Sequence, residues 1–166
     1  MKKFFSYDPK LLVYGFLIVF FASYGQTFFI SLFNTDIRNY YNLSDGEFGF
    51  VYAISTLISS CILVSFAKLI DHIDLRIYSL FITAGLFFAC ACMAFLMNHI
   101  VFLFLTIFML RFFGQGAMTH AGETTMARYF GNNRGKALSV ATLGGMTGVM
   151  FLPFIAVNLM SDFIMN

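Results

Sequence analysis

The chain has 166 residues and a formal net charge of +2; 60% of its residues are hydrophobic and 11% are charged. A soluble domain of this size carries about twice that charged fraction. With a mean hydropathy of +0.82, the composition therefore excludes an ordinary soluble protein. The apolar runs are far longer than the roughly 10-residue alternating strands of a membrane barrel. We therefore expect an all-α bundle of transmembrane helices, with the lipid bilayer and not nucleic acid as its partner.

Five apolar runs follow one another within what we expect to be a single transmembrane domain, residues 1–166. The expected spans are residues 11–33, 48–70, 77–97, 100–126 and 138–160. The first run is longer than the 7–15 residues typical of a signal-peptide core, so an uncleaved span is expected. Ser44 and Glu47 form a capping-box pattern at the start of the second span. Glycines in the fifth span predict close packing on the first span; they are Gly144, Gly145 and Gly148.

The fourth span carries the most informative polar residues of the chain. Arg111 lies about 16 Å along the helix from Ile100, near the middle of a hydrocarbon core about 30 Å thick. A cation at that depth costs at least ~2.5 kcal/mol on insertion scales, so the guanidinium should face the bundle interior or a wet cavity. Gln115, Thr119 and Glu123 follow at intervals of four residues, which predicts one polar stripe along the helix.

A second polar position lies in the first span, where Gln26 needs a partner in the middle of the bilayer. Arg111, Gln115 and Gln26 are therefore the candidate substrate-binding residues. The alternative for Arg111 is a structural bond to a helix carbonyl or to Gln26, and the alternative for Gln26 is an interhelical hydrogen bond without a ligand.

The sequence contains no pattern typical of an enzyme. Its three cysteines lie inside apolar runs and lack the spacing of a metal pair or disulfide. No nucleophile–base pair, metal-ligand cluster or phosphate loop is evident. We therefore expect no catalytic residue, no metal and no cofactor.

Basic residues alternate between the two sides of the expected spans. They precede span one, flank the loop after span two and follow span four, at Lys2, Lys3, Lys10, Lys68, Arg76, Arg128, Arg134 and Lys136. The loops on the other side hold only Arg38 or none. The positive-inside rule therefore predicts a cytoplasmic N-terminus in the cell (inner or plasma) membrane and a C-terminus outside.

Four segments match a known pattern of membrane proteins. The loop AKLIDHIDLR (residues 67–76) follows the form G-x-L-x-D-R-x-G-R-R at Asp71 and Arg76. In the fourth span, RFFGQG (residues 111–116) is similar to R-x-x-x-G-x-x, with its glycines displaced by one position. An Arg134-Gly135 pair precedes the fifth span, which is itself rich in glycine.

Together, and in this order, these segments resemble the N-terminal part of a major facilitator superfamily transporter. The family has two six-span halves with the solute site near the midplane between them. The resemblance implies a partial secondary active transporter with five of the usual twelve spans, whose remainder is separately encoded. A small organic anion is the expected solute, because Arg111 is a cation.

The resemblance also implies a charge cluster at an inner gate, made by Asp71, Arg76, Glu123 and Arg134. Two structural alternatives remain: Asp71 can cap the third span, and Glu123 can be a solvated carboxylate at the interface. For the whole chain, the alternatives are a small membrane scaffold or interaction protein, and an inactive truncated remnant of a transporter. A homo-oligomeric pore is the least favoured, because the polar stripe is confined mainly to one helix.

Overall fold

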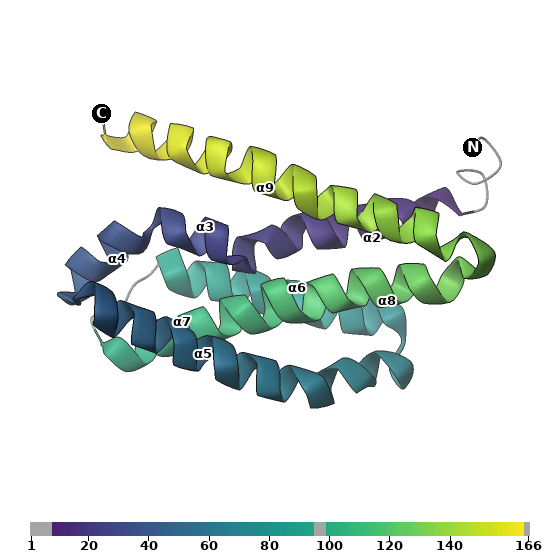
Figure 1. Cartoon of the computed structure of the whole chain (residues 1–166), viewed down its shortest axis with the longest axis horizontal. Coiled ribbons are helices and arrows are strands. Elements are labelled where there is room, and N and C mark those ends of the chain that lie inside the picture. Colours follow the sequence, from purple (N-terminus) through teal and green to yellow (C-terminus); the bar gives the residue numbers. More distant parts are fainter. Residues whose placement is uncertain (1–7, 95–98, 165–166) are drawn as a thin grey trace.

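Five long apolar helices form the architecture of the chain (Figure 1). The computed structural model describes residues 8–94 and 99–164, with side chains to Leu159. The candidate membrane spans are Pro9–Leu32, Asp45–Asp71, Leu75–Ala94, Ile100–Tyr129 and Gly131–Leu159. Within the described residues there is no strand. The prediction of an all-α bundle with five spans is therefore confirmed.

Several of the spans are built from more than one helical segment. The first comprises α2 (Pro9–Ala22), η1 (Ser23–Gly25) and α3 (Thr27–Leu32), and a short helix, α4 (Asn34–Tyr41), follows it. The second comprises α5 (Asp45–Phe66) and η2 (Ala67–Asp71), and the third is α6 (Leu75–Ala94). The fourth comprises α7 (Ile100–Met109), η3 (Leu110–Met118) and α8 (Thr119–Tyr129); then η4 (Gly131–Asn133) leads into α9 (Arg134–Ile164). The expected end of the third span at residues 95–97, like Lys2 and Lys3, lies outside the described residues.

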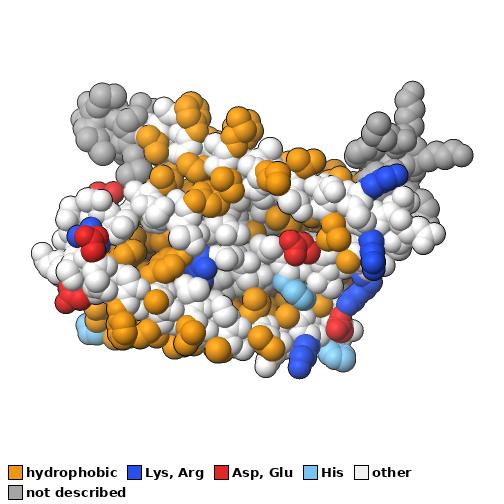
Figure 2. Space-filling view, viewed as in Figure 1, with side chains coloured by type: hydrophobic (Ala, Val, Ile, Leu, Met, Phe, Trp, Pro, Cys, Tyr) orange, Lys and Arg blue, Asp and Glu red, His pale blue; other side chains and the backbone are white. Residues whose placement is uncertain are grey.

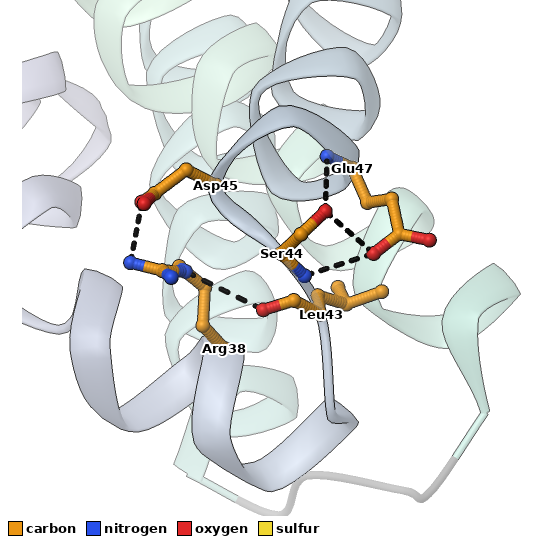
Figure 3. Close-up of polar contacts among 5 residues, drawn as sticks. All are labelled: Arg38, Leu43, Ser44, Asp45 and Glu47. Atoms are coloured by element: carbon orange, nitrogen blue, oxygen red, sulfur yellow. Dashed lines mark hydrogen bonds and ion pairs between the residues drawn. The ribbon is translucent and has the colours of Figure 1, made fainter.

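Side chains at the starts of α2 and α5 cap these helices with hydrogen bonds. The Asp8 side chain accepts a hydrogen bond from the backbone N–H of Leu11 at 3.1 Å, at the start of α2. At the start of α5, Ser44 and Glu47 make both bonds of the predicted capping box, which is therefore confirmed (Figure 3). In the same turn, Arg38 donates to the carbonyl of Leu43 and pairs with Asp45.

The first and fifth spans pack most extensively, and Figure 1 shows α9 crossing α2 along one side of the bundle. A Cβ placed on Gly144 would lie 2.9 Å from the carbonyl carbon of Phe16, and one on Gly148 would lie 2.9 Å from the carbonyl oxygen of Phe20. The two backbones can approach this closely only because these positions carry no side chain. The prediction that glycines pack span five on span one is confirmed.

The described side chains bury one main apolar cluster and expose a second apolar surface. The main cluster joins α2, α6, the fourth span and α9, with Ile82, Ala117 and Met126 fully buried. Outward-facing positions are also apolar, such as Leu57, Leu80, Phe87 and Met150. Figure 2 shows hydrophobic side chains over the length of the molecule and most basic side chains at one end. This distribution is the one that a lipid environment favours.

Candidate functional site

Arg111 lies at the centre of a polar cluster formed by three spans. Its side chain is buried, so the prediction that it faces the bundle interior is confirmed. Its Nε donates to Thr56 Oγ1 at 3.2 Å, and its Nη1 donates to the carbonyl of Gly25 at 3.3 Å and to Thr27 Oγ1 at 3.2 Å. The ring of Tyr52 lies 5.4 Å from Cζ, and the Tyr52 hydroxyl donates to Thr27 Oγ1 at 2.8 Å. Tyr52, Thr27 and the guanidinium therefore form one connected network.

A break in the first span supplies the carbonyl that Arg111 binds. The backbone is extended at Gln26 (φ −78°, ψ 152°), between η1 and α3. The N–H groups of Phe29 and Ile30 both donate to the carbonyl of Gln26, which leaves the Gly25 carbonyl without a helix partner. Inside a bilayer such a group must be satisfied within the protein. The Nη1 of Arg111 satisfies it.

Two glycines allow the broken span to reach Arg111. A Cβ on Gly25 would lie 2.7 Å from the Cα of Gly114, and a Cβ on Gly114 would lie 2.7 Å from the Cα of Gly25. The backbones of the first and fourth spans therefore touch at this point, and any side chain would separate them.

The segment that carries Arg111 is a π-helix, Leu110–Met118. π-Turns are rare, close with i→i+5 hydrogen bonds and often occur at functional sites. The single polar stripe predicted from 3.6-residue periodicity is divided in the structure, because Arg111 contacts the first and second spans whereas Thr119 and Glu123 line a pocket beside α9.

The other two candidate substrate-binding residues make no hydrogen bond with Arg111 in the described part of the chain. Gln115 is half-buried, and its Oε1 is buried without a hydrogen-bond partner. Gln26 lines a different pocket, of about 270 Å³, between the first span, α8 and α9. Thr119 and Glu123 line this pocket together with Gln26.

The four residues of the expected charge cluster are distributed over different places. Asp71 and Arg76 line one pocket of about 430 Å³ at the end of the bundle, between the start of α2, the η2–α6 loop and α8. Asp71 pairs with Arg128, and both side chains are about half exposed. Glu123 lies in the other pocket, and neither Glu123 nor Arg134 makes an ion pair among the described residues.

Asp71 does not cap the third span, which was the structural alternative for this residue. Asp74 Oδ1, not Asp71, accepts the hydrogen bond from the backbone N–H of Arg76, at 2.8 Å. Asp71 is the last residue of η2, which directs its carboxylate toward Arg128 on α8.

Sequence reasoning missed four residues that the structure brings to these two places. They are Thr27, Tyr52 and Thr56 beside Arg111, and Arg128 beside Asp71. Hydroxyl-bearing residues within apolar spans are a general signal for interhelical hydrogen bonds. That signal marks Thr27, Tyr52 and Thr56 as candidates, but it does not say which span each one meets, and it does not apply to Arg128.

Comparisons with known proteins yield one match. The family model described as Major Facilitator Superfamily matches residues 15–164. No curated protein and no solved structure matches the chain.

Proposed function

Since the chain belongs to the Major Facilitator Superfamily, whose members are membrane transporters, we propose that it contributes to the transport of a small organic anion. In this proposal the guanidinium of Arg111 binds the anionic group of the solute. Gln115 and Gln26 contribute polar contacts along the same pathway.

The observation that carries the proposal is the unused hydrogen-bonding capacity of a buried cation. A guanidinium has five N–H donors. Arg111 uses three of them, one on Nε and two on Nη1, for Thr56, Gly25 and Thr27. The Nη2 has no hydrogen-bond partner among the described residues, and no described carboxylate pairs with the charge. An anionic solute would supply both the missing acceptor and the missing charge.

The two ends of the spans support an orientation for this pathway. Among the described residues, Lys10, Lys68, Arg76, Arg128, Arg134 and Lys136 lie at the end where α2 and α9 begin. The positive-inside rule favours the cytoplasm for this end, and we assign it so in the cell membrane. The Asp71–Arg128 pair and Arg76 then lie at the inner mouth, where we propose a gating role for them together with Arg134. Glu123, the fourth residue of the expected charge cluster, lies apart from them in the pocket lined by Gln26 and Thr119.

The test measures binding of radiolabelled acetate, hexanoate, succinate and methyl phosphate to the full chain in lipid nanodiscs. We expect at least one anion to bind, and Arg111→Ala to weaken it by about 10- to 150-fold, the equivalent of a charged hydrogen bond of about 1.5–3 kcal/mol. Arg111→Lys should retain part of the affinity because it keeps the charge.

The matched control is Arg38→Ala, which removes an arginine at the far loop where it pairs with Asp45. It should leave the affinity unchanged. If no anion binds, or if Arg38→Ala weakens binding as much as Arg111→Ala does, the proposal is wrong and a scaffold role is favoured.

A further inference from the structure

The pocket between the first span, α8 and α9 contains a carboxylate that the proposed function does not use for the solute. Glu123 lines this pocket of about 270 Å³ with Ser23, Gln26, Thr119 and Thr142. No Lys, Arg or His is among the described residues that line it. The side chain of Glu123 is exposed and makes no hydrogen bond or ion pair in the described part of the chain.

Glu123 lies inside the fourth candidate span rather than in a loop. Arg111 and Glu123 are the only Asp, Glu, Lys or Arg residues of the described part that lie more than five residues from either end of their candidate span. Ionisable residues within a span are rare, and they usually mark solute or ion pathways. Figure 2 shows acidic and basic side chains on one face, between the two ends of the molecule.

The lining of the pocket matches a group that donates several hydrogen bonds. Besides Glu123, its lining residues include three that carry hydroxyls, Ser23, Thr119 and Thr142, and one that carries an amide, Gln26. The Thr119 Oγ1 is buried without a partner. Thr142 donates to the carbonyl of Leu138 at 3.0 Å, so its oxygen still has lone pairs available to accept. An ammonium group has three N–H donors and one positive charge, which such a set of oxygens can satisfy.

The pocket and the Arg111 cluster lie against consecutive residues of the broken span. Gly25 and Thr27 hold the guanidinium, and Gln26 between them lines the Glu123 pocket. Along the fourth span, twelve positions separate Arg111 from Glu123, at most about 18 Å between their Cα atoms at the rise of an α-helix. Both charges therefore lie on one span, and a solute that binds both must carry its own charges on an extended chain.

We propose that the solute is dipolar: its anionic group binds Arg111 and its ammonium group binds Glu123 in the pocket lined by Gln26, Thr119 and Thr142. This inference rests on the proposed function, and it narrows the substrate class from organic anions to amino acids whose two charges are separated by a chain of several carbons.

The experiment compares solutes that differ only in their charges, using the full chain in nanodiscs at pH 7. The probes are 4-aminobutyrate, 6-aminohexanoate and 8-aminooctanoate. Each is compared with two other compounds of the same chain length, one that carries only the carboxylate and one that carries only the amine. At the length that fits, the amino acid should bind at least 10-fold more tightly than the carboxylate or the amine. Glu123→Gln should remove that advantage and leave the affinity for the simple carboxylate unchanged.

The control Asp36→Asn removes an exposed carboxylate on α4 and should change none of these affinities. Thermal unfolding of Glu123→Gln verifies that the variant folds, and Glu123→Asp should restore part of the preference. The inference is wrong if no amino acid of the series binds more tightly than its matched carboxylate, or if Glu123→Gln keeps the preference for the amino acid. In either case, Arg111-dependent binding of carboxylates still supports the proposed function. If carboxylate affinity instead rises when Glu123 is replaced, the residue repels anions, and the ammonium site is likewise overturned.

Discussion

Neutral oxygen atoms, rather than a carboxylate, surround the guanidinium of Arg111. Two threonine hydroxyls and one backbone carbonyl accept its described hydrogen bonds, and the face of Tyr52 lies beside it. These groups stabilise the cation without neutralising it, which leaves its charge available for a ligand. A buried Arg–carboxylate pair would satisfy the cation internally and remove that capacity.

Tyr52 gives a direct test of this network at the level of one residue. Tyr52→Phe removes the hydroxyl that donates to Thr27 but keeps the ring beside Arg111, so we expect a loss of about 0.5–1.5 kcal/mol in the free energy of unfolding. Tyr52→Leu also removes the cation–π contact and should lose about 0.5–2 kcal/mol more. Unfolding in detergent micelles measures both values.

Tyr129→Phe is the matched control for Tyr52→Phe. Tyr129 is exposed at the end of α8, and its replacement should change the free energy of unfolding by less than about 0.5 kcal/mol. Equal stability of Tyr52→Phe and Tyr52→Leu would show that the ring does not stabilise the cation.

At the level of the elements, glycines determine how closely the first span meets its two neighbours. Gly25 and Gly114 bring the broken segment against the π-helix of span four. Gly144 and Gly148 bring α9 against α2. Helix association in lipid depends on packing and hydrogen bonds rather than on the hydrophobic effect, and small residues favour it because they let the backbones approach closely. The first span is consequently held on both sides, even though it is interrupted at Gln26.

The contact between α9 and α2 predicts the effect of a single methyl group. Gly148→Ala places a Cβ 2.9 Å from the carbonyl oxygen of Phe20, so one backbone must shift. We expect a loss of about 1–3 kcal/mol in the free energy of unfolding, as for other overpacked sites. Gly135→Ala on the same helix meets nothing within 4 Å and should be neutral or stabilising by up to about 1 kcal/mol. Equal unfolding temperatures for the two variants would contradict the close packing.

At the level of the whole molecule, the two ends of the bundle differ in charge. Most of the described basic residues lie where α2, α6 and α9 begin and where η2 and α8 end, whereas the opposite end has Arg38. The Asp71–Arg128 pair joins two spans at the basic end, but its half-exposed side chains contribute at most about 1 kcal/mol. A contact this weak can open and close during a conformational change.

Labelling of single cysteines tests the orientation of the whole molecule. In a background that lacks Cys61, Cys90 and Cys92, we expect Asn132→Cys to react with an impermeant maleimide in inside-out vesicles. Asn39→Cys should react in intact cells instead, because an odd number of spans separates the two positions from each other. The reverse result would contradict a cytoplasmic N-terminus, and reaction of both positions from one side would contradict the arrangement of spans.

Local features of the sequence were sufficient to determine the class of fold and the burial of Arg111. Apolar runs, the Ser44–Glu47 cap and the cost of a charge in lipid depend only on nearby residues, so they could be interpreted without a structure. Tertiary structure decided which groups meet: Arg111 contacts Thr27 and Thr56, which lie 84 and 55 residues away, and Asp71 contacts Arg128 rather than α6. It also decided the break at Gln26 and the π-helical segment that carries Arg111. The physical reason is that hydropathy and capping are local, whereas hydrogen-bond partners and helix register depend on how closely the spans pack.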